Sequence, residues 1–369
     1  MVTSMKKILL CFILILSASM QVRADTGTAA LSYLKTDSGG RAAALGGAYT
    51  ALGDDSFSIF YNPAGTVYRD RSEVALSHAL WLEDMSIENA AFVHTLSSRL
   101  SLLMGVSALL SGDIKSYSAD GDSAGSFSSN EMTVSGGISY IINQRFYIAA
   151  QGKLFSQSTD DESARAVGGD FGMLYRGDYM RIAFSALNLG QKIKIGTQSF
   201  DLPRTLRAGI SREMIKNLKI GIDWIDYIDS GSHVAAGMEY GLQIRDDGEQ
   251  SLFLRGGYSS GHDTNAGSGI SAGIGFNTTD LRVDYAFTPY GDLGSAHRFS
   301  IALMFGERRS NMRETYEYHY RSREENRRQS ENKLFKKGKE RVADIPVNTT
   351  YEEYKPIRQE EKKVKEFTW

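Results

Sequence analysis

The sequence is almost free of cysteine and poor in proline. Its 369 residues include one Cys and five Pro. A single cysteine excludes both a disulfide framework and a zinc site built from cysteine thiolates. No run of 18 consecutive apolar residues occurs, so the sequence offers no candidate for a helix that spans a membrane.

The sequence also lacks an excess of charge of either sign. The 42 Lys and Arg nearly balance the 44 Asp and Glu, which gives a net charge of −2. This balance argues against a nucleic-acid partner, because a surface that binds phosphates needs a basic excess.

Motifs of enzymes and of cofactor-binding proteins are missing or out of context. The six His are scattered without metal-ligand spacing, and no phosphate-binding or dinucleotide loop occurs. The pattern G-x-S-x-G at 269–273 matches that of serine hydrolases, but it lies within an expected strand and no helix follows it. We therefore expect no catalytic residues, no metal, no cofactor and no enzymatic activity.

The N-terminus has the three regions of a secretory signal peptide. Lys6 and Lys7 precede the apolar run 8–16, and small residues follow up to Ala24. The pattern predicts cleavage after Ala24, which removes 1–24 together with Cys11. The alternative, a membrane anchor, is disfavoured because the run is shorter than the ~20 apolar residues that cross a bilayer.

The middle of the chain is rich in residues typical of strands and turns. It combines many of the 37 Gly, 19 Tyr and 17 Phe with a period-2 alternation, for instance in 281–287, where the odd positions are apolar. Fourteen strands are predicted, at 73–81, 86–96, 99–110, 130–142, 145–157, 165–176, 179–189, 205–213, 217–227, 232–242, 250–259, 267–277, 280–288 and 296–305.

The connections between these strands alternate in length. Most even-numbered ones are tight turns, whereas the odd-numbered ones at 111–129, 190–204 and 260–266 are long and polar. This alternation is typical of outer-membrane barrels. We predict an all-β fold, a transmembrane antiparallel β-barrel of about 14 strands, in the outer membrane of a Gram-negative-type cell with both mature termini in the periplasm. A secreted soluble sandwich or propeller would explain the strands but not the loop lengths.

The last strand supports the barrel. Apolar residues occupy every second position and end in an aromatic residue, at Phe299, Ile301, Leu303 and Phe305. This pattern resembles the C-terminal recognition strand of outer-membrane proteins. It implies outer-membrane lipid and the barrel-assembly machinery as partners.

The segment 25–70 does not follow the strand pattern. It holds a Gly- and Ala-rich stretch at 38–48, in which the alanines are expected to form a short helix, and it ends in Asn62-Pro63-Ala64-Gly65. This segment resembles the N-terminus of the PorV/PorQ family of outer-membrane proteins. Shorter likenesses follow at 187–190, 202–209, 237–240, 254–258 and 284–300.

The PorV/PorQ family is similar in fold to the long-chain fatty-acid transporters of the FadL type. The resemblance implies a 14-stranded barrel with an N-terminal hatch in its lumen, and Asn62-Pro63-Ala64 matches the Asn-Pro-Ala motif of that hatch. We expect Asp54 and Asp55 to pair with Arg41 or with a lumen-facing cation such as Arg282. The candidates for the hatch and the ligand path are Arg41, Asp54, Asp55, Tyr61, Asn62, Pro63 and Ala64, with bracing of the lumen as the alternative role.

The C-terminal part is highly charged. Residues 307–369 contain 17 Lys and Arg and 13 Asp and Glu, too few apolar residues for a core. The chain is therefore expected to consist of a signal peptide (1–24), a hatch segment (25–70), a barrel (71–306) and a helical or disordered periplasmic tail (307–369).

Two main functions are consistent with this organisation. The likeness to fatty-acid transporters implies passive transport of small hydrophobic molecules. The likeness to PorV implies instead a type IX secretion component that binds and shuttles secreted cargo proteins, with a periplasmic partner for the tail. A structural outer-membrane protein tethered through residues 307–369 is a third hypothesis.

Overall fold

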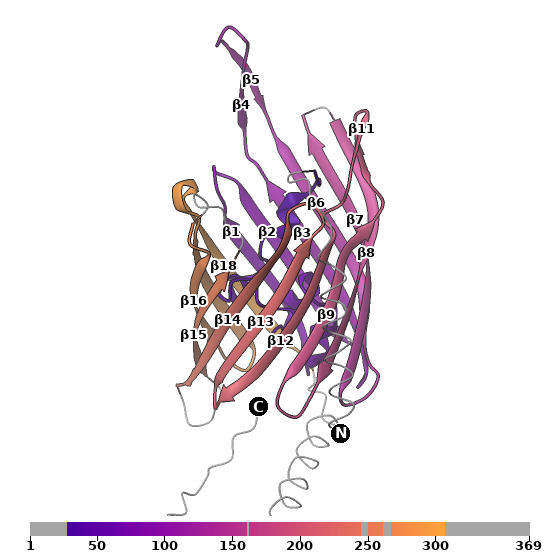
Figure 1. The fold of residues 1–369 in the computed structure, drawn as a ribbon, viewed down its shortest axis with the longest axis vertical. Helices are drawn as coiled ribbons and strands as arrows, with labels where there is room; N and C mark the ends of the chain where they lie inside the picture. The colour runs from indigo at the N-terminus through magenta and orange to yellow at the C-terminus, as the bar shows by residue number, and fades with distance from the viewer. Residues whose placement is uncertain (1–27, 161, 245–249, 261–266, 307–369) are drawn as a thin grey trace, which may run out of the picture. The chain divides into compact units, whose positions relative to one another are not determined.

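A closed barrel forms most of the structure. The computed structural model describes residues 28–160, 162–244, 250–260 and 267–306. Fourteen antiparallel strands follow one another around the barrel in chain order, and the last pairs with the first (Figure 1). The predicted fold class is thus confirmed. The predicted signal peptide and the predicted tail lie outside the described residues. The partners expected for the tail therefore stay a prediction.

The strands match the predicted ranges within a few residues. The barrel strands are β1 (Ser72–Leu80), β2 (Ser86–Thr95), β3 (Leu100–Leu110), β6 (Ser129–Ile141), β7 (Phe146–Thr159), β8 (Glu162–Arg176), β9 (Arg181–Gly190), β12 (Thr205–Ile215), β13 (Leu218–Tyr227), β14 (Gly231–Gln243), β15 (Ser251–Ser259), β16 (Ile270–Asn277), β17 (Leu281–Pro289) and β18 (Ser295–Phe305). A short 3-10 helix, η4 (Gly291–Leu293), connects the last two strands.

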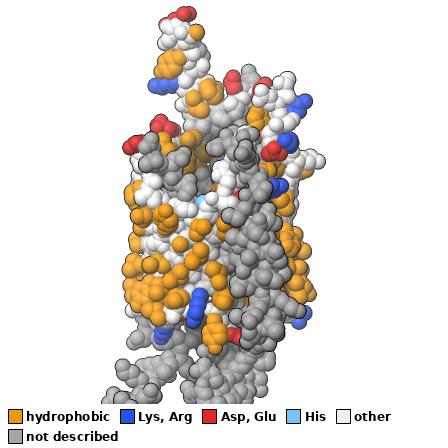
Figure 2. Space-filling view, in the orientation of Figure 1, with side chains coloured by type: hydrophobic (Ala, Val, Ile, Leu, Met, Phe, Trp, Pro, Cys, Tyr) orange, Lys and Arg blue, Asp and Glu red, His pale blue; other side chains and the backbone are white. Residues whose placement is uncertain are grey.

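Side chains alternate between the two faces of the barrel wall. In β18 the residues Phe299, Ile301, Leu303 and Phe305 are exposed on the outside, whereas Arg298 between the outer positions is buried. The same alternation in the other strands makes the visible outer wall mainly hydrophobic, with charges toward its ends (Figure 2). The four residues of the predicted assembly signal therefore share the outer face, and their use by an assembly machinery stays a prediction.

Two of the expected loops contain additional hairpins. Within 111–129, β4 (Ile114–Tyr117) pairs with β5 (Ser123–Phe127), and within 190–204, β10 (Ile193–Ile195) pairs with β11 (Gln198–Phe200). The β4–β5 hairpin projects beyond the barrel strands (Figure 1). These four strands were not predicted, because they are short and lie among Ser, Gly and Asp, which are typical of turns.

Residues 28–71, which we call the lumenal segment, form no barrel strand. They form η1 (Ser32–Lys35), α2 (Gly40–Ala44), η2 (Ser56–Phe60) and η3 (Pro63–Tyr68). The helix α2 contacts β15 to β18, η2 contacts β1 to β3, and η3 contacts β3 and β6 to β8. The segment therefore fills the interior, where most of its side chains are buried (Figure 1). None of the described helices is long and apolar enough to cross a membrane.

Glycine allows the lumenal segment to turn and to approach the wall. The chain leaves α2 through Gly46 and Gly47, whose φ angles of +63° and +77° favour glycine. A Cβ added to Gly257 of β15 would overlap the backbone of Leu45 and Gly46. At this contact the wall has no side chain, and the backbone of the lumenal segment occupies the space that a side chain would fill.

Closure of the barrel between β1 and β18 is directly testable. Leu76 and Ile301 are paired across these strands and both point outward, and a mature chain cleaved after Ala24 has no other cysteine. The double variant L76C/I301C should form a disulfide on oxidation, because directly opposite Cα atoms lie about 4.5–5.5 Å apart. Faster migration of the denatured, non-reduced protein on a gel would report the bond.

The control pair for this experiment is L76C/I222C. Ile222 is equally exposed but lies on β13, which is not a neighbour of β1. Equal cross-linking of both pairs, or of neither, would contradict the described closure.

Candidate functional site in the barrel lumen

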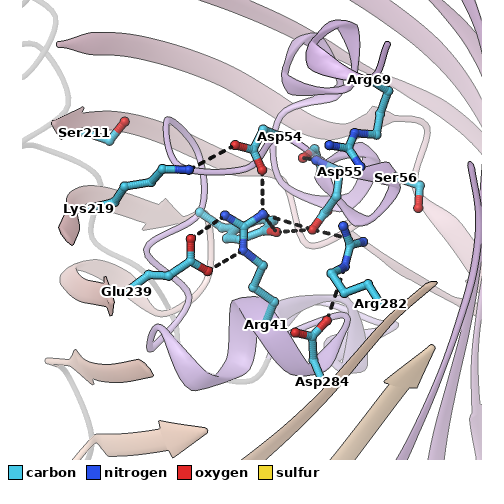
Figure 3. A network of polar contacts seen from close by, with 12 residues as sticks. Arg41, Asp54, Asp55, Ser56, Arg69, Ser211, Lys219, Glu239, Arg282 and Asp284 are labelled. Atoms are coloured by element: carbon cyan, nitrogen blue, oxygen red, sulfur yellow. Dashed lines mark hydrogen bonds and ion pairs between the residues drawn. The ribbon is translucent and has the colours of Figure 1, made fainter. Parts of the chain in front are cut away.

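Arg41 of α2 is the centre of a buried network of charges (Figure 3). Its Nε and Nη2 donate to the two carboxylate oxygens of Glu239 on β14, at 2.7 and 2.8 Å. Its Nη1 donates to Asp54 at 2.5 Å and to Asp55 at 3.3 Å. One guanidinium thus links the helix to the barrel wall on one side and to the turn before η2 on the other.

The network continues along the wall. Arg255 of β15 lies 2.7 Å from both Glu239 and Asp284. Arg282 of β17 pairs with Asp284 at 3.3 Å, with Asp55 at 3.3 Å and with Glu73 of β1 at 2.9 Å. Because the N–H of Ser56 also donates to Glu73 at 2.9 Å, the lumenal segment is tied to strands on both sides of the β1–β18 closure.

The ion pairs of this network are buried, so each charge depends on its partner and the pairs hold the segment in position. The side chains of Arg41, Asp55, Glu239 and Arg282 are each at most 7% exposed. Burial alone raises the pKa of Asp54, but Arg41, Lys219 and Arg181 lower it more, so that its pKa lies well below the usual range. Asp54 consequently stays ionised and keeps its attraction for Arg41 in mildly acidic conditions.

A second anchor holds the turn after α2. The carboxylate of Asp223 on β13 accepts hydrogen bonds from the backbone N–H groups of Tyr49 (2.9 Å) and Thr50 (2.8 Å), and from the Thr50 hydroxyl (2.6 Å). Arg207 of β12 pairs with Asp223 at 3.3 Å and donates to the carbonyl of Gly47. Backbone groups that have no helical partner are thereby satisfied by the wall.

A third anchor is formed by the Asn-Pro-Ala motif. The Asn62 Nδ2 donates to the carbonyl oxygens of Thr50 and of Met173 on β8, both at 3.1 Å, while its Oδ1 accepts from the N–H of Ala64 at 3.1 Å. Pro63 occupies the first position of η3, where its missing N–H costs nothing. Asn62 thus both begins the helix and joins it to the wall.

The structure divides the predicted site residues into two groups. Arg41, Asp54 and Asp55 meet in the charge network, and the predicted pairing of Asp54 and Asp55 with Arg41 and of Asp55 with Arg282 is present. Tyr61, Asn62, Pro63 and Ala64 lie apart from that network. The Tyr61 ring stacks edge-on against Tyr49, and its hydroxyl donates to Asp37 at 3.0 Å. Their contact with a ligand stays a prediction.

Several wall residues of the site were not identified from the sequence. They share an inward position on a barrel strand, as Glu73, Arg207, Asp223, Glu239, Arg255 and Asp284 do. The sequence does mark such residues, because each is a charged residue at a polar position of an alternating strand. Arg282 and Asp284 are examples, since they alternate with the apolar Leu281, Val283 and Tyr285. That pattern shows that a side chain faces the lumen but not which partner it meets.

A small cavity adjoins the lumenal segment. A polar cavity of about 30 Å³ is lined by Tyr61, Lys153, Asn188 and Arg207, among others. Such a cavity accommodates a water molecule but not a hydrocarbon. The described residues contain no group of three or more His, Cys, Asp and Glu that could hold a metal ion.

Comparison with known protein sequences gives a limited result. Residues 15–175 match the model of a family described as Uncharacterised protein family (UPF0164). The match covers less than half of the chain. A search of curated proteins found no match.

Solved structures resemble the barrel. The CymD monoaromatic hydrocarbon channel matches with a TM-score of 0.51 and 13% identity, over 73% of this chain and 98% of the channel. The toluene transporter TodX of P. putida matches with a TM-score of 0.51 and 11% identity, over 73% of this chain and 99% of TodX. At this identity the likeness concerns the fold. The expected 14-stranded barrel is confirmed, and the assignment to the PorV/PorQ family, with its likeness to FadL, stays a prediction.

Removal of one carboxylate should loosen the lumenal segment. In E239Q, Arg41 and Arg255 lose their shared negative partner, and breaking a buried pair in this way costs ~3–5 kcal/mol. We expect the backbone amides of 42–50 to exchange hydrogen about 10²-fold faster or more, measured by mass spectrometry on the purified barrel.

The matched control for E239Q is E83Q, because Glu83 is exposed in the turn between β1 and β2. Its amide exchange at 42–50 should equal that of the wild type. Unchanged exchange in E239Q would mean that the charge network does not hold the segment.

Proposed function

We propose that the protein is an outer-membrane channel for passive transport of small hydrophobic molecules. The observation that carries the proposal is a closed barrel whose lumen is filled by a separate segment of chain. A barrel that served only as a scaffold would fill its lumen with its own side chains. Here the wall has glycines at the contact with α2, and polar groups hold the segment in place.

The outer wall supports a membrane location. Large hydrophobic side chains such as Leu76, Met104, Leu154, Ile274 and Leu303 are each about half exposed on it. Exposed apolar surface of this extent is unfavourable in water and favourable in lipid. A closed barrel also satisfies its backbone hydrogen bonds within a bilayer.

The filled lumen supports a gated rather than an open path. The cavity of about 30 Å³ is too small for the proposed cargo, so the lumenal segment has to move before a molecule can pass. Its polar anchors are arranged for such a movement, because ion pairs and hydrogen bonds can be exchanged for others or for water. The hatch role of 28–71 is therefore part of the proposal.

The hydrophobic nature of the cargo rests on two observations. A buried apolar cluster lies between the segment and the wall, formed by Leu31, Tyr33, Ala79, Ile87 and Phe155 with further residues from β8 and the β10–β11 region. The structurally similar CymD and TodX are named as a monoaromatic hydrocarbon channel and a toluene transporter. We take toluene as the first probe.

A disulfide that fixes the segment should block transport. Ala43 and Ala44 of α2 form a buried cluster with Ala286 of β17, so A44C/A286C can join the helix to the wall. Uptake of radiolabelled toluene by Gram-negative cells that produce the oxidised variant should fall to the level of cells without the protein. Reduction should restore uptake, because the bond is then broken.

The control is L76C/I301C, which carries a disulfide in the wall but leaves the segment free. Its uptake should equal that of the wild type in both redox states. Wild-type uptake by the oxidised A44C/A286C variant would contradict gating by the lumenal segment.

One described feature favours the secretion role as a second candidate. The β4–β5 hairpin projects from the barrel (Figure 1) and carries Ile114 and Tyr117, which are 38% and 62% exposed. Exposed aromatic and aliphatic side chains on such an arm suit contacts with another protein.

The two candidates differ in what the hairpin does. If the barrel binds secreted proteins, I114S/Y117S should reduce the amount of protein that co-purifies with it from native membranes, whereas toluene uptake stays unchanged. If the barrel is a channel only, the variant should co-purify the same proteins as the wild type, as identified by mass spectrometry.

A further inference from the structure

Among the described residues, Arg298 of β18 is a buried cation without an ion-pair partner. Its side chain points into the lumen and the residue is 2% exposed. Within the part of the chain that the structure describes, it makes no ion pair, and its Nε and Nη2 have no hydrogen-bond partner. A buried charge in this state is strongly unfavourable, so a partner from outside the chain would stabilise it.

The two unpaired nitrogens form one edge of the guanidinium. Nε–H and Nη2–H point in the same direction, which matches the two oxygens of a carboxylate. Arg41 uses this same edge for Glu239, at 2.7 and 2.8 Å. The edge that binds a carboxylate in Arg41 therefore has no hydrogen-bond partner in Arg298.

Two more buried donors without partners lie on the neighbouring strands. They are the Ser77 hydroxyl of β1 and the Asn89 Nδ2 of β2. The Asn89 Oδ1 is occupied, because it accepts from Ser38 at 3.1 Å and from Ser107 at 2.8 Å. The orphaned donors are thus three groups on three adjacent strands.

The strand register brings these groups to one patch of the inner wall. Ser77 is paired with Asn89 on one side and with Ser300 on the other, two residues from Arg298. Ser77 is therefore a diagonal neighbour of Arg298 and within reach of a long side chain, and Asn89 lies one strand further along the wall. Arg298 itself is flanked by Ala79 and Ala286, which are too small to cover its guanidinium.

An aromatic surface adjoins the charge. The Arg298 guanidinium lies 6.0 Å from the centre of the Trp81 ring, and Trp81 meets Tyr290 edge-to-face at 5.0 Å. Trp81 also packs against the apolar cluster described above. A ligand bound here would meet a cation at one end and aromatic and aliphatic groups at the other.

We propose that Arg298, Ser77 and Asn89 bind the carboxylate of an aromatic monocarboxylate whose ring lies against Trp81 and Tyr290. The part of this site in uptake rests on the proposed transport function. The binding itself does not, because it requires only that the groups that bury Arg298 move apart within the folded barrel.

Benzoate and benzamide are the probes that test the site, since they share shape but differ in charge. Calorimetric titration of the full detergent-solubilised protein should show benzoate binding at least about tenfold tighter than benzamide. In R298Q the affinity for benzoate should fall about ten- to a hundredfold, because a charge-assisted pair of hydrogen bonds is lost. R298K keeps the charge but not the paired edge, and should bind with intermediate affinity.

The matched control is R99Q, which removes an exposed arginine in the turn before β3 and should bind benzoate like the wild type. Equal affinity of the wild type for benzoate and benzamide, or no binding of benzoate at millimolar concentration, would overturn the proposal. This comparison needs no variant and so holds even if R298Q fails to fold.

The experiments can refute the binding site and the transport function independently of each other. Benzoate binding together with toluene uptake that is unaffected by the oxidised A44C/A286C bond would leave the site in place and refute the gated channel. Blocked toluene uptake in that variant, with no difference between benzoate and benzamide, would refute the site alone.

Discussion

The pairing of buried charges is the constraint on which the interior of this barrel depends. Arg41 sits on a five-residue helix inside the lumen, where its side chain is buried. Ions in such surroundings are tolerated only when they are paired and hydrogen-bonded. Glu239 from the wall and Asp54 and Asp55 from the segment meet this requirement together. The position of α2 follows from the positions of these carboxylates.

The wall makes room for the lumenal segment and also pairs with its charged side chains. Gly257 and Gly237 have no side chain at the place where Leu45 and Gly46 approach. Gly172 likewise faces Asn62 and Pro63. Close packing at these points and ion pairing elsewhere act on the same short stretch of chain. Shape therefore sets where the segment lies, and charge sets which of its groups face which strand.

The barrel could be predicted from the sequence far better than its contents. Alternation such as that in 281–287 identifies each strand because one face must be apolar and the other polar. The hairpins β4–β5 and β10–β11 were not predicted, because strands of three to five residues are too short to show a clear alternation. In the site, the pairing of Asp54 and Asp55 with Arg41 followed from their closeness in sequence. The links to Glu239 and Asp223 did not, because partners about 175 to 200 residues apart are set by strand register and barrel curvature.

The order of the chain has a consequence for how the barrel assembles. The lumenal segment precedes β1, and β18 closes the wall against that first strand. Glu239, which pairs with Arg41, and Arg282, which pairs with Asp55, both belong to the last five strands. The charged side chains of the segment therefore stay solvated until the final third of the chain has been added. The segment must also lie inside the lumen before β18 pairs with β1. Contacts of such long range form slowly, so the enclosure of the segment and the closure of the wall belong to one late folding event.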